Sequence, residues 1–340
     1  MKKVDMKIGV IGAGAWGTAL ANHLAEKGFD VDLWAFEAEV CADILEAREN
    51  KLFLPGFRLS QNIRPSNDLD RVAAGKDLLL LVMPSHVFRS VAVNLVHHPA
   101  ERTYIVSASK GIENETHLTM SGILQQILPP RLHSQITVLS GPSFAREVAQ
   151  KIPTAVTVAA HNPEVARQVQ SAFAAQYFRV YTSYDVIGVE LGGAVKNVMA
   201  IAAGISDGLG LGFNTRAALI TRGITEIQRL GRRLGADSKT FMGLAGIGDL
   251  VLTCTGTLSR NWTLGHKLGQ GMKLDTILSE RRSVAEGVKT TKSVYNLSRK
   301  IGVEMPIAEQ IYRILYEDLD PKAALRILMS RDLRQEHDEE

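Results

Sequence analysis

The segment Lys7-Ile-Gly-Val-Ile-Gly-Ala-Gly-Ala-Trp-Gly17 contains the pattern G-x-G-x-x-G and decides how the first half of the chain is interpreted. The pattern follows a predicted strand at Lys7–Ile11 and opens a predicted helix at Trp16–Lys27, and a second predicted strand begins at Val31. In this context the pattern is typical of dinucleotide binding. An ordinary glycine-rich turn between a strand and a helix is the competing interpretation.

Each glycine of the pattern has a distinct expected role. Gly12 permits a tight turn, Gly14 lets the backbone approach a pyrophosphate, and Gly17 allows the helix to pack closely on the strand. The phosphates then lie on free N–H groups at the start of the helix. Glu37, just after the second strand, favours NAD if it faces the ribose, but a solvated residue opening the next helix explains it equally well.

Strand-like and helix-like segments alternate through the first half of the chain. Leu78–Val82 lacks polar alternation, as expected for a strand covered on both faces. The alternation predicts βαβ units and an α/β fold with a Rossmann-like, doubly wound, mostly parallel sheet. The predicted strands are Lys7–Ile11, Val31–Trp34, Asp77–Val82, Tyr104–Ser107, Ile136–Leu139, Ala155–Ala159 and Phe178–Tyr181, and the helices between them include Trp16–Lys27, Val87–Val96 and Pro163–Ala175.

The character of the sequence changes near Asp185. Strand signals nearly vanish and long helical patterns follow, which predicts an all-helical second domain. We therefore expect a Rossmann-like nucleotide-binding domain over residues 1–184, an all-helical substrate and catalytic domain over residues 185–330, and a polar tail over residues 331–340. The predicted helices are Val186–Ile205, Arg216–Leu234, Val288–Arg299 and Ile307–Leu315.

Composition argues against several classes of protein. Of the 340 residues, 45% are hydrophobic and 22% are charged, which is ordinary for a globular protein. The net charge is only +3 and no block of Lys or Arg stands out, so we expect no nucleic-acid partner. No run approaches the ~20 apolar residues of a membrane span. The two cysteines, Cys41 and Cys254, favour a reducing cytoplasm over a disulfide framework.

Lys196 is the only ionisable residue between Glu190 and Asp207. Helical spacing places it on a stripe of small residues within Gly188–Ala200, which leaves room for a ligand or another backbone beside the ammonium. Burial lowers the pKa of a lysine and makes it an acid–base catalyst near neutral pH. A lysine that reaches solvent from a packed face explains the helix equally well. Asn197 would add a hydrogen bond to a bound oxygen.

Two polar groups follow further along the chain. Asp249 and Thr253 are four residues apart and share a face if their segment is helical. Ser259, Arg260 and Asn261 precede a helix-like segment and would bind a phosphate through free amides and a guanidinium. By sequence alone, a plain helix cap followed by a surface arginine is the somewhat better explanation of the second group.

Polar residues also follow two predicted strands. Lys110 comes after Tyr104–Ser107, and Gly141 and Ser143 come after Ile136–Leu139, at the sheet edge where α/β proteins bind ligands. Lys110 would hold an anionic substrate there, although a solvated loop lysine is the default interpretation. No His or Cys cluster has metal-ligand spacing, so we expect no metal site.

Eight motifs, in order, resemble those of bacterial NAD(P)-dependent glycerol-3-phosphate dehydrogenases over nearly the whole chain. Their combination is far more specific than any one of them. The motifs are Val10-Ile-Gly-Ala-Gly-Ala-Trp-Gly-Thr-Ala-Leu20, Pro84-Ser-His86, Ser109-Lys-Gly111, Ser140-Gly-Pro-Ser-Phe-Ala145, Gly192-Gly-Ala-Val-Lys-Asn197, Gly248-Asp-Leu-Val-Leu-Thr253, Ser259-Arg-Asn261 and Val284-Ala-Glu-Gly287.

The resemblance implies reversible conversion of dihydroxyacetone phosphate to sn-glycerol 3-phosphate with NAD or NADP, a product that feeds glycerophospholipid synthesis. It also implies a Rossmann-like domain followed by an all-helical domain, usually in a cytoplasmic homodimer. One departure bears on the cofactor, because relatives often carry Arg or His where this chain has Phe36, near the adenosine 2′ group. Phe36 would stack on the adenine instead, and the sequence leaves the choice between NAD and NADP open.

The same resemblance assigns roles to individual residues. Lys196 would give and take the proton at the C2 oxygen of the substrate, with Lys110 and Asp249 supporting it. The catalytic set is Lys196, Lys110, Asp249 and Thr253. The substrate-binding set is Lys110, Gly141, Ser143, Lys196, Asn197, Asp249, Ser259, Arg260 and Asn261. The cofactor-binding set is Gly12, Gly14, Ala15, Trp16, Gly17, Phe36, Lys110, Ala145, Arg260, Val284 and Glu286.

Two other functions fit part of the pattern. Another reductase of similar build, acting on a hydroxy or keto acid, would recognise a carboxylate at the site formed by Ser259, Arg260 and Asn261. A nucleotide-sensing module without turnover would need no buried lysine, so replacement of Lys196 would leave its behaviour intact.

Overall fold

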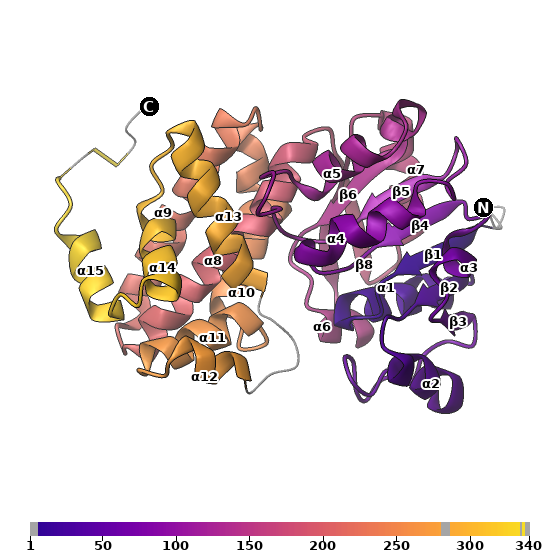
Figure 1. The fold of residues 1–340 in the computed structure, drawn as a ribbon, viewed down its shortest axis with the longest axis horizontal. Helices are drawn as coiled ribbons and strands as arrows, with labels where there is room; N and C mark the ends of the chain where they lie inside the picture. Colours follow the sequence, from indigo (N-terminus) through magenta and orange to yellow (C-terminus); the bar gives the residue numbers. More distant parts are fainter. Residues whose placement is uncertain (1–5, 280–285, 334, 337–340) are drawn as a thin grey trace.

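The structure is a computed structural model that describes residues 6–279, 286–333, 335 and 336 (Figure 1). An eight-stranded sheet flanked by helices occupies the chain up to Ser183, and every helix or strand described from Val186 onward is a helix. We call these the sheet half and the helical half; they lie side by side in Figure 1. The predicted fold class, a Rossmann-like sheet followed by helices, is confirmed.

The sheet has the order β3-β2-β1-β4-β5-β6-β7-β8. All neighbouring strands are parallel except β6 and β7, so the sheet is mostly parallel, as predicted. The strands are β1 (Lys7–Ile11), β2 (Asp30–Trp34), β3 (Ile63–Ser66), β4 (Leu78–Leu81), β5 (Tyr104–Ser107), β6 (Ile136–Ser140), β7 (Thr154–Ala160) and β8 (Phe178–Ser183).

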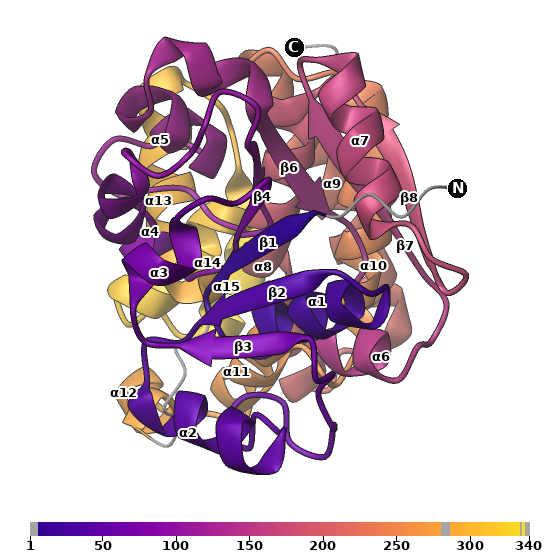
Figure 2. The same cartoon turned by 90° about the vertical axis from the view of Figure 1, so that its right-hand side faces the viewer.

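Helices cover the sheet on both faces (Figure 2). In β4, Leu78 and Leu80 join the hydrophobic core under α1, α6 and α7, while Leu79 and Leu81 join the core under α3, α4 and α5. This explains why the strand carries no polar residue. The helices are α1 (Ala15–Glu26), α2 (Ala38–Ala47), α3 (Leu69–Ala73), α4 (Ser85–Ala92), α5 (Met120–Ile127), α6 (Ala145–Ala149) and α7 (Pro163–Phe173).

The strand β3 is not among those predicted from the sequence. This strand has four residues, and Pro65 within it cannot donate a backbone hydrogen bond. It is tolerated because β3 lies at the edge of the sheet and pairs only with β2.

The helical half is built around α8 (Val186–Gly208), which is buried along nearly its whole length. Among the described residues, α8 is the one helix long and apolar enough to cross a membrane, with a mean hydropathy of 1.5, but 94% of that window is buried inside the protein. Its apolar character is therefore explained by packing. The other helices are α9 (Gly212–Arg233), α10 (Asp249–Thr255), α11 (Arg260–Gly269), α12 (Leu274–Ser279), α13 (Glu286–Ile301), α14 (Pro306–Tyr316) and α15 (Pro321–Met329).

Glycines bring α8 and α11 unusually close together. A Cβ atom on Gly204 would lie 2.1 Å from the Trp262 carbonyl oxygen, and one on Gly265 would lie 2.1 Å from that of Ile201. Both distances are far inside van der Waals contact, so only glycine fits at these positions. These contacts fix the first half of α11 against the C-terminal part of α8.

Candidate active site

The turn between β1 and α1 has the geometry that its glycine pattern predicts. Gly12 has a φ of 117°, and a Cβ there would lie 2.3 Å from the Val82 carbonyl oxygen. A Cβ on Gly17 would lie 1.9 Å from the Gly12 carbonyl oxygen, so the helix packs directly on the turn. Gly14, in contrast, has no neighbouring atom within 4 Å of its Cβ position. Its open side leaves the start of α1 accessible to a ligand.

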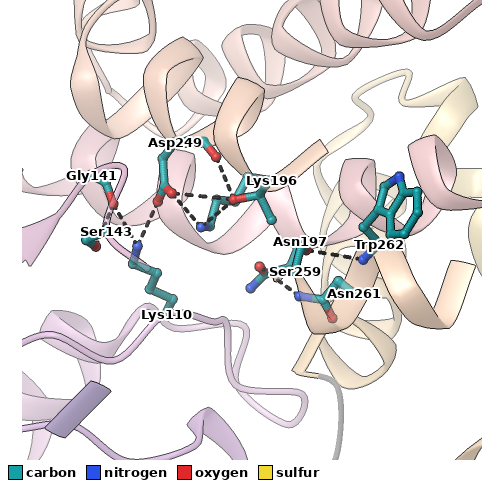
Figure 3. Close-up of polar contacts among 10 residues, drawn as sticks. Lys110, Gly141, Ser143, Lys196, Asn197, Asp249, Ser259, Asn261 and Trp262 are labelled. Atoms are coloured by element: carbon teal, nitrogen blue, oxygen red, sulfur yellow. Dashed lines mark hydrogen bonds and ion pairs between the residues drawn. The ribbon is translucent and has the colours of Figure 1, made fainter. Parts of the chain in front are cut away.

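Residues from the ends of β5 and β6 meet at the same edge of the sheet. Lys110 Nζ donates a hydrogen bond of 3.2 Å to the Gly141 carbonyl oxygen, and Ser143 Oγ donates one of 2.9 Å to the same oxygen (Figure 3). Lys110 is therefore no solvated loop lysine, and only 15% of its side chain is exposed.

One carboxylate from the helical half joins two lysines. Asp249 Oδ1 lies 2.6 Å from Lys196 Nζ, and Asp249 Oδ2 lies 2.7 Å from Lys110 Nζ (Figure 3). Asp249 and Lys196 are buried. Because Lys110 comes from the sheet half, this cluster lies where the two halves meet.

Asp249 and Thr253 accept two of the three N–H groups of the Lys196 ammonium and leave the third without either of them as a partner. Asp249 and Thr253 lie on one face of α10, and Thr253 Oγ donates to the Asp249 carbonyl oxygen at 2.6 Å. The hydroxyl oxygen therefore accepts from Lys196, at 2.8 Å. An ammonium has three N–H donors, so one remains for a bound oxygen after Asp249 and Thr253 are satisfied.

The surroundings of Lys196 tune its acidity. Burial lowers the pKa of Lys196 to about 8, and the neighbouring Lys110 ammonium lowers it as well, while Asp249 opposes both effects. Lys196 is therefore largely protonated at neutral pH and loses its proton just above it. This is the range in which a general acid and base is effective.

A second polar cluster lies beside the first, at the start of α11. Ser259 Oγ caps the helix by accepting from the Trp262 N–H at 3.2 Å. Asn261 Nδ2 donates to Asn197 Oδ1 at 3.0 Å (Figure 3). Asn261 Oδ1 accepts from the Gly287 N–H at 3.0 Å. The cap interpretation is thus correct for Ser259, and the same turn brings Asn261 into contact with Asn197, the residue that follows Lys196.

Arg260 and Glu286 add charge around these clusters. Arg260 is exposed at the first position of α11, and Glu286 is the first residue of α13. Burial raises the pKa of Glu286, while Arg260, Lys110 and Lys196 lower it, so the carboxyl group lies within electrostatic reach of all three cations. Val284, expected at the cofactor, lies outside the described residues.

The remaining residues expected at the cofactor lie around the sheet edge. Ala15 and Trp16 begin α1, and Ala145 begins α6. Trp16 Nε1 is buried and has no hydrogen-bond partner among the described residues. Phe36 follows β2 and is 80% exposed, with its ring edge-on to Trp34.

The small residues of α8 pack against backbone and side chains. A Cβ on Gly192 would lie 2.2 Å from the Ala245 carbonyl oxygen, and one on Gly193 would lie 2.5 Å from Ser140 Oγ. The sequence left open whether a ligand or another backbone lies beside this stripe of small residues. At Gly192 the neighbour is backbone. In the described part of the chain, no group of three or more His, Cys, Asp or Glu side chains is placed to hold a metal ion.

Comparisons with known proteins agree with this architecture. Two family models, described as the N-terminus and the C-terminus of NAD-dependent glycerol-3-phosphate dehydrogenase, match residues 7–166 and 185–326. The chain belongs to the NAD-dependent glycerol-3-phosphate dehydrogenase family. The resemblance drawn from the eight motifs is thereby confirmed.

Individual members of the glycerol-3-phosphate dehydrogenase family match nearly the whole chain. The glycerol-3-phosphate dehydrogenase [NAD(P)+] of Syntrophobacter fumaroxidans is 58% identical over 97% of this chain and 97% of its own length. That of Geobacter metallireducens is 59% identical over 97% of this chain and 98% of its own. The crystal structure of glycerol-3-phosphate dehydrogenase from Coxiella burnetii superposes with a TM-score of 0.91 at 40% identity, covering 96% of this chain and 99% of that one.

Proposed function

We propose that the chain catalyses the reversible reduction of dihydroxyacetone phosphate to sn-glycerol 3-phosphate with NAD or NADP. The observation that carries this proposal is the buried Lys196 ammonium, held by Asp249 and Thr253 where the two halves meet. Family membership supplies the substrate class, and the geometry supplies an acid–base group in the place where such a reaction needs one.

The turn between β1 and α1 fits a dinucleotide. The Cβ position of Gly14 is open, and Trp16, whose buried Nε1 has no hydrogen-bond partner among the described residues, is the second residue of α1. Backbone N–H groups at such a helix start bind phosphates. Gly12, Gly14, Ala15, Trp16 and Gly17 would hold the pyrophosphate side of the nucleotide. The other residues proposed to border it are Phe36, Lys110, Ala145, Arg260, Val284 and Glu286. When bound, the nicotinamide supplies the hydride for reduction.

Lys196 would act on the carbonyl oxygen of the substrate. Its third N–H points to no partner named above, so it can donate to that oxygen, stabilise the developing negative charge and transfer its proton. With a pKa of about 8, the ammonium is present at neutral pH and the neutral amine forms readily enough to serve the reverse reaction. Lys110 and Asp249 would hold this group in place.

The start of α11 would hold the phosphate of the substrate. Arg260 is exposed and offers a guanidinium at the free N–H groups of the first helical turn. Asn261 and Asn197 lie between this point and Lys196. We place Ser259, Gly141 and Ser143 around the rest of the substrate. Fixing the phosphate would orient the reacting carbon, so remote binding serves catalysis.

The organisation of the whole protein is part of the proposal. We assign residues 1–184 to nucleotide binding, residues 185–330 to the substrate and catalysis, and residues 331–340 to a polar tail. We also propose a homodimer in the cytoplasm whose product enters glycerophospholipid synthesis. These assignments are supported by family membership and by the change from strands to helices after Ser183.

The decisive assay is oxidation of NADH, and separately of NADPH, with dihydroxyacetone phosphate or ketopantoate as the acceptor. We expect turnover with dihydroxyacetone phosphate and none with ketopantoate; the reverse result would assign the chain to the rival class of reductases. Lys196→Ala should lower turnover at least about a hundredfold, the low end for acid–base groups. Nucleotide affinity, measured by nicotinamide fluorescence, should stay near that of the wild type. A fully active Lys196→Ala variant would show that Lys196 is not the acid–base catalyst.

A further inference from the structure

A second set of contacts joins the two halves beside the lysine cluster. Residues 109–121, which we call the Lys110 hairpin, leave β5, carry Lys110 near their start and run into α5. An antiparallel bridge between Ile112 and Thr119 closes the hairpin on itself. In Figure 1, α5 lies at the side of the sheet half that faces the helices. The position of Lys110 therefore depends on how this hairpin is attached.

Glu190 of α8 attaches the end of the hairpin to the helical half. Its carboxylate is only 5% exposed and accepts from the Ser121 N–H at 2.8 Å and from the Ser121 hydroxyl at 2.5 Å. Burial raises the pKa of Glu190. A buried carboxyl group is tolerated only where hydrogen bonds replace its lost hydration, and here both oxygens have a partner in the hairpin. Glu190 precedes Lys196 by less than two turns of the same helix.

The start of the hairpin is attached to the helical half as well. The Ile112 side chain is buried in the hydrophobic core that α8 forms with the other helices, although Ile112 follows a strand of the sheet half. Ser293 of α13 donates to the Ile112 carbonyl oxygen at 2.8 Å. Lys110 stands two residues before this anchor. Both ends of the hairpin are thus fastened to helices that border the lysine cluster.

We propose that Glu190 is a positioning residue for Lys110. By fixing the end of the hairpin to the helix that carries Lys196, it keeps the Lys110 ammonium in contact with Asp249. Its effect on rate rests on the proposed function, whereas its effect on the placement of Lys110 does not. In such sites a displacement of about 1 Å costs on the order of a hundredfold in rate.

The chain offers a matched control in Glu226 of α9. This carboxylate is equally buried and accepts from the backbone N–H groups of Ile307 and Ala308, at 2.7 and 3.2 Å, at the start of α14. It has the same chemistry as Glu190, a buried carboxylate at a helix start, but it fastens one element of the helical half to another. Its loss should disturb packing without releasing the hairpin.

The first test measures the reactivity of Lys110 without substrate or nucleotide. Wild type, Glu190→Ala, Glu190→Gln and Glu226→Ala are treated with acetic anhydride, and lysine acetylation is measured by mass spectrometry of peptides. Lys76 is the internal reference, because its side chain is 9% exposed and paired with Asp32 at 2.6 Å.

Release of the hairpin should raise the labelling of Lys110 relative to Lys76 in Glu190→Ala, by about tenfold if local opening exposes the amine. Glu190→Gln keeps an acceptor for the Ser121 N–H, so its ratio of Lys110 to Lys76 labelling should lie between those of Glu190→Ala and wild type. Glu226→Ala should keep the wild-type ratio. An unchanged ratio in a folded Glu190→Ala protein overturns the proposal. If that variant does not fold, the same comparison is made with Ser121→Ala, where an unchanged ratio has the same meaning.

The second test is the pH dependence of ketone reduction. The titratable groups that interact electrostatically with Lys196 are Asp249 and Cys254 of α10, Lys110 of the hairpin and Glu286 at the start of α13, while Arg260 of α11 acts on Glu286. Since Lys110 lowers the pKa of Lys196, moving it away should raise that pKa and shift the basic limb of the profile upward from about 8.

Glu190→Ala should show this upward shift together with a lower kcat, and Glu226→Ala should show neither. A lower kcat with an unmoved limb would indicate a purely structural effect and count against positioning. If wild type does not reduce dihydroxyacetone phosphate, the proposed function fails, and the labelling ratio alone then decides whether Glu190 positions Lys110.

Discussion

Replacing Asp249 with asparagine removes the charge that the two lysines share but keeps the shape of the side chain. Asp249 is the group that raises the pKa of Lys196 against burial and against Lys110. Without it, the neutral amine is favoured. The reduction needs the protonated form, so activity is lost as pH rises through this pKa. We therefore expect the basic limb of the pH–rate profile to move to lower pH in Asp249→Asn.

The size of the effect follows from the distance between the charges. An opposite charge in contact, here 2.6 Å from Lys196 Nζ, changes a pKa by about 1–3. A fall from about 8 to roughly 6 reduces the protonated fraction at about pH 7.5 from three quarters to near 3%, a loss of about 25-fold. Below roughly pH 5.5 Lys196 is largely protonated in both proteins, so the loss of activity that comes from its deprotonation should vanish.

The assay is kcat for dihydroxyacetone phosphate reduction across pH, with thermal melting to confirm that each variant is folded. Lys110→Met provides the opposing comparison, because loss of its positive charge should raise the pKa of Lys196 and move the same limb upward. Limbs that coincide with wild type in both variants would show that Lys196 is not the titrating acid. A loss in Asp249→Asn that is equal at every pH would give Asp249 a structural role only.

Three further results are expected. Arg260→Ala should chiefly raise KM for the phosphate substrate, by more than it weakens nucleotide binding, and an unchanged KM would place the phosphate elsewhere. Gly17→Ala should abolish nucleotide binding or folding, because its Cβ would lie 1.9 Å from the Gly12 carbonyl oxygen, whereas Gly14→Ala should fold normally; melting curves and nucleotide titration compare the two. Burial raises the pKa of Glu226 to about 7, so the unfolded chain loses that proton first and unfolding free energy should fall between about pH 4.5 and 7. Denaturant titrations should show that the unfolding free energy of Glu226→Gln falls less over this pH range than that of wild type. The same pH dependence in both proteins would contradict a raised pKa of Glu226.

Most of the sheet could be predicted because its signals are local. The bounds of β1 and β5 agree with prediction, and the continuous apolar run of β4 correctly indicates burial on both faces. The edge strand β3 could not be found in this way. Its residues form a strand because β2 offers a free edge, and that is a property of the folded sheet.

The site was only partly predictable for the same reason. Lys196 stands out in the sequence because no other ionisable residue lies near it on its helix, and Asp249 and Thr253 share a face as expected. That Asp249 also binds Lys110 joins residues 139 positions apart. Glu190 was visible only as an acidic residue in an apolar helix. Its partner Ser121 is 69 positions away, and no spacing rule relates the two.

The glycines before Lys196 show how packing and chemistry depend on each other in α8. Gly192 lets the backbone at Ala245 approach, and Asp249 follows four residues later. Gly193 lies against Ser140 and against the side chain of Lys110. A methyl group at either position would push away one of the elements that bring a charged group to Lys196. Burial lowers the pKa of Lys196, and the contact with Asp249 keeps that pKa from falling further. Both thus depend on the same two small residues.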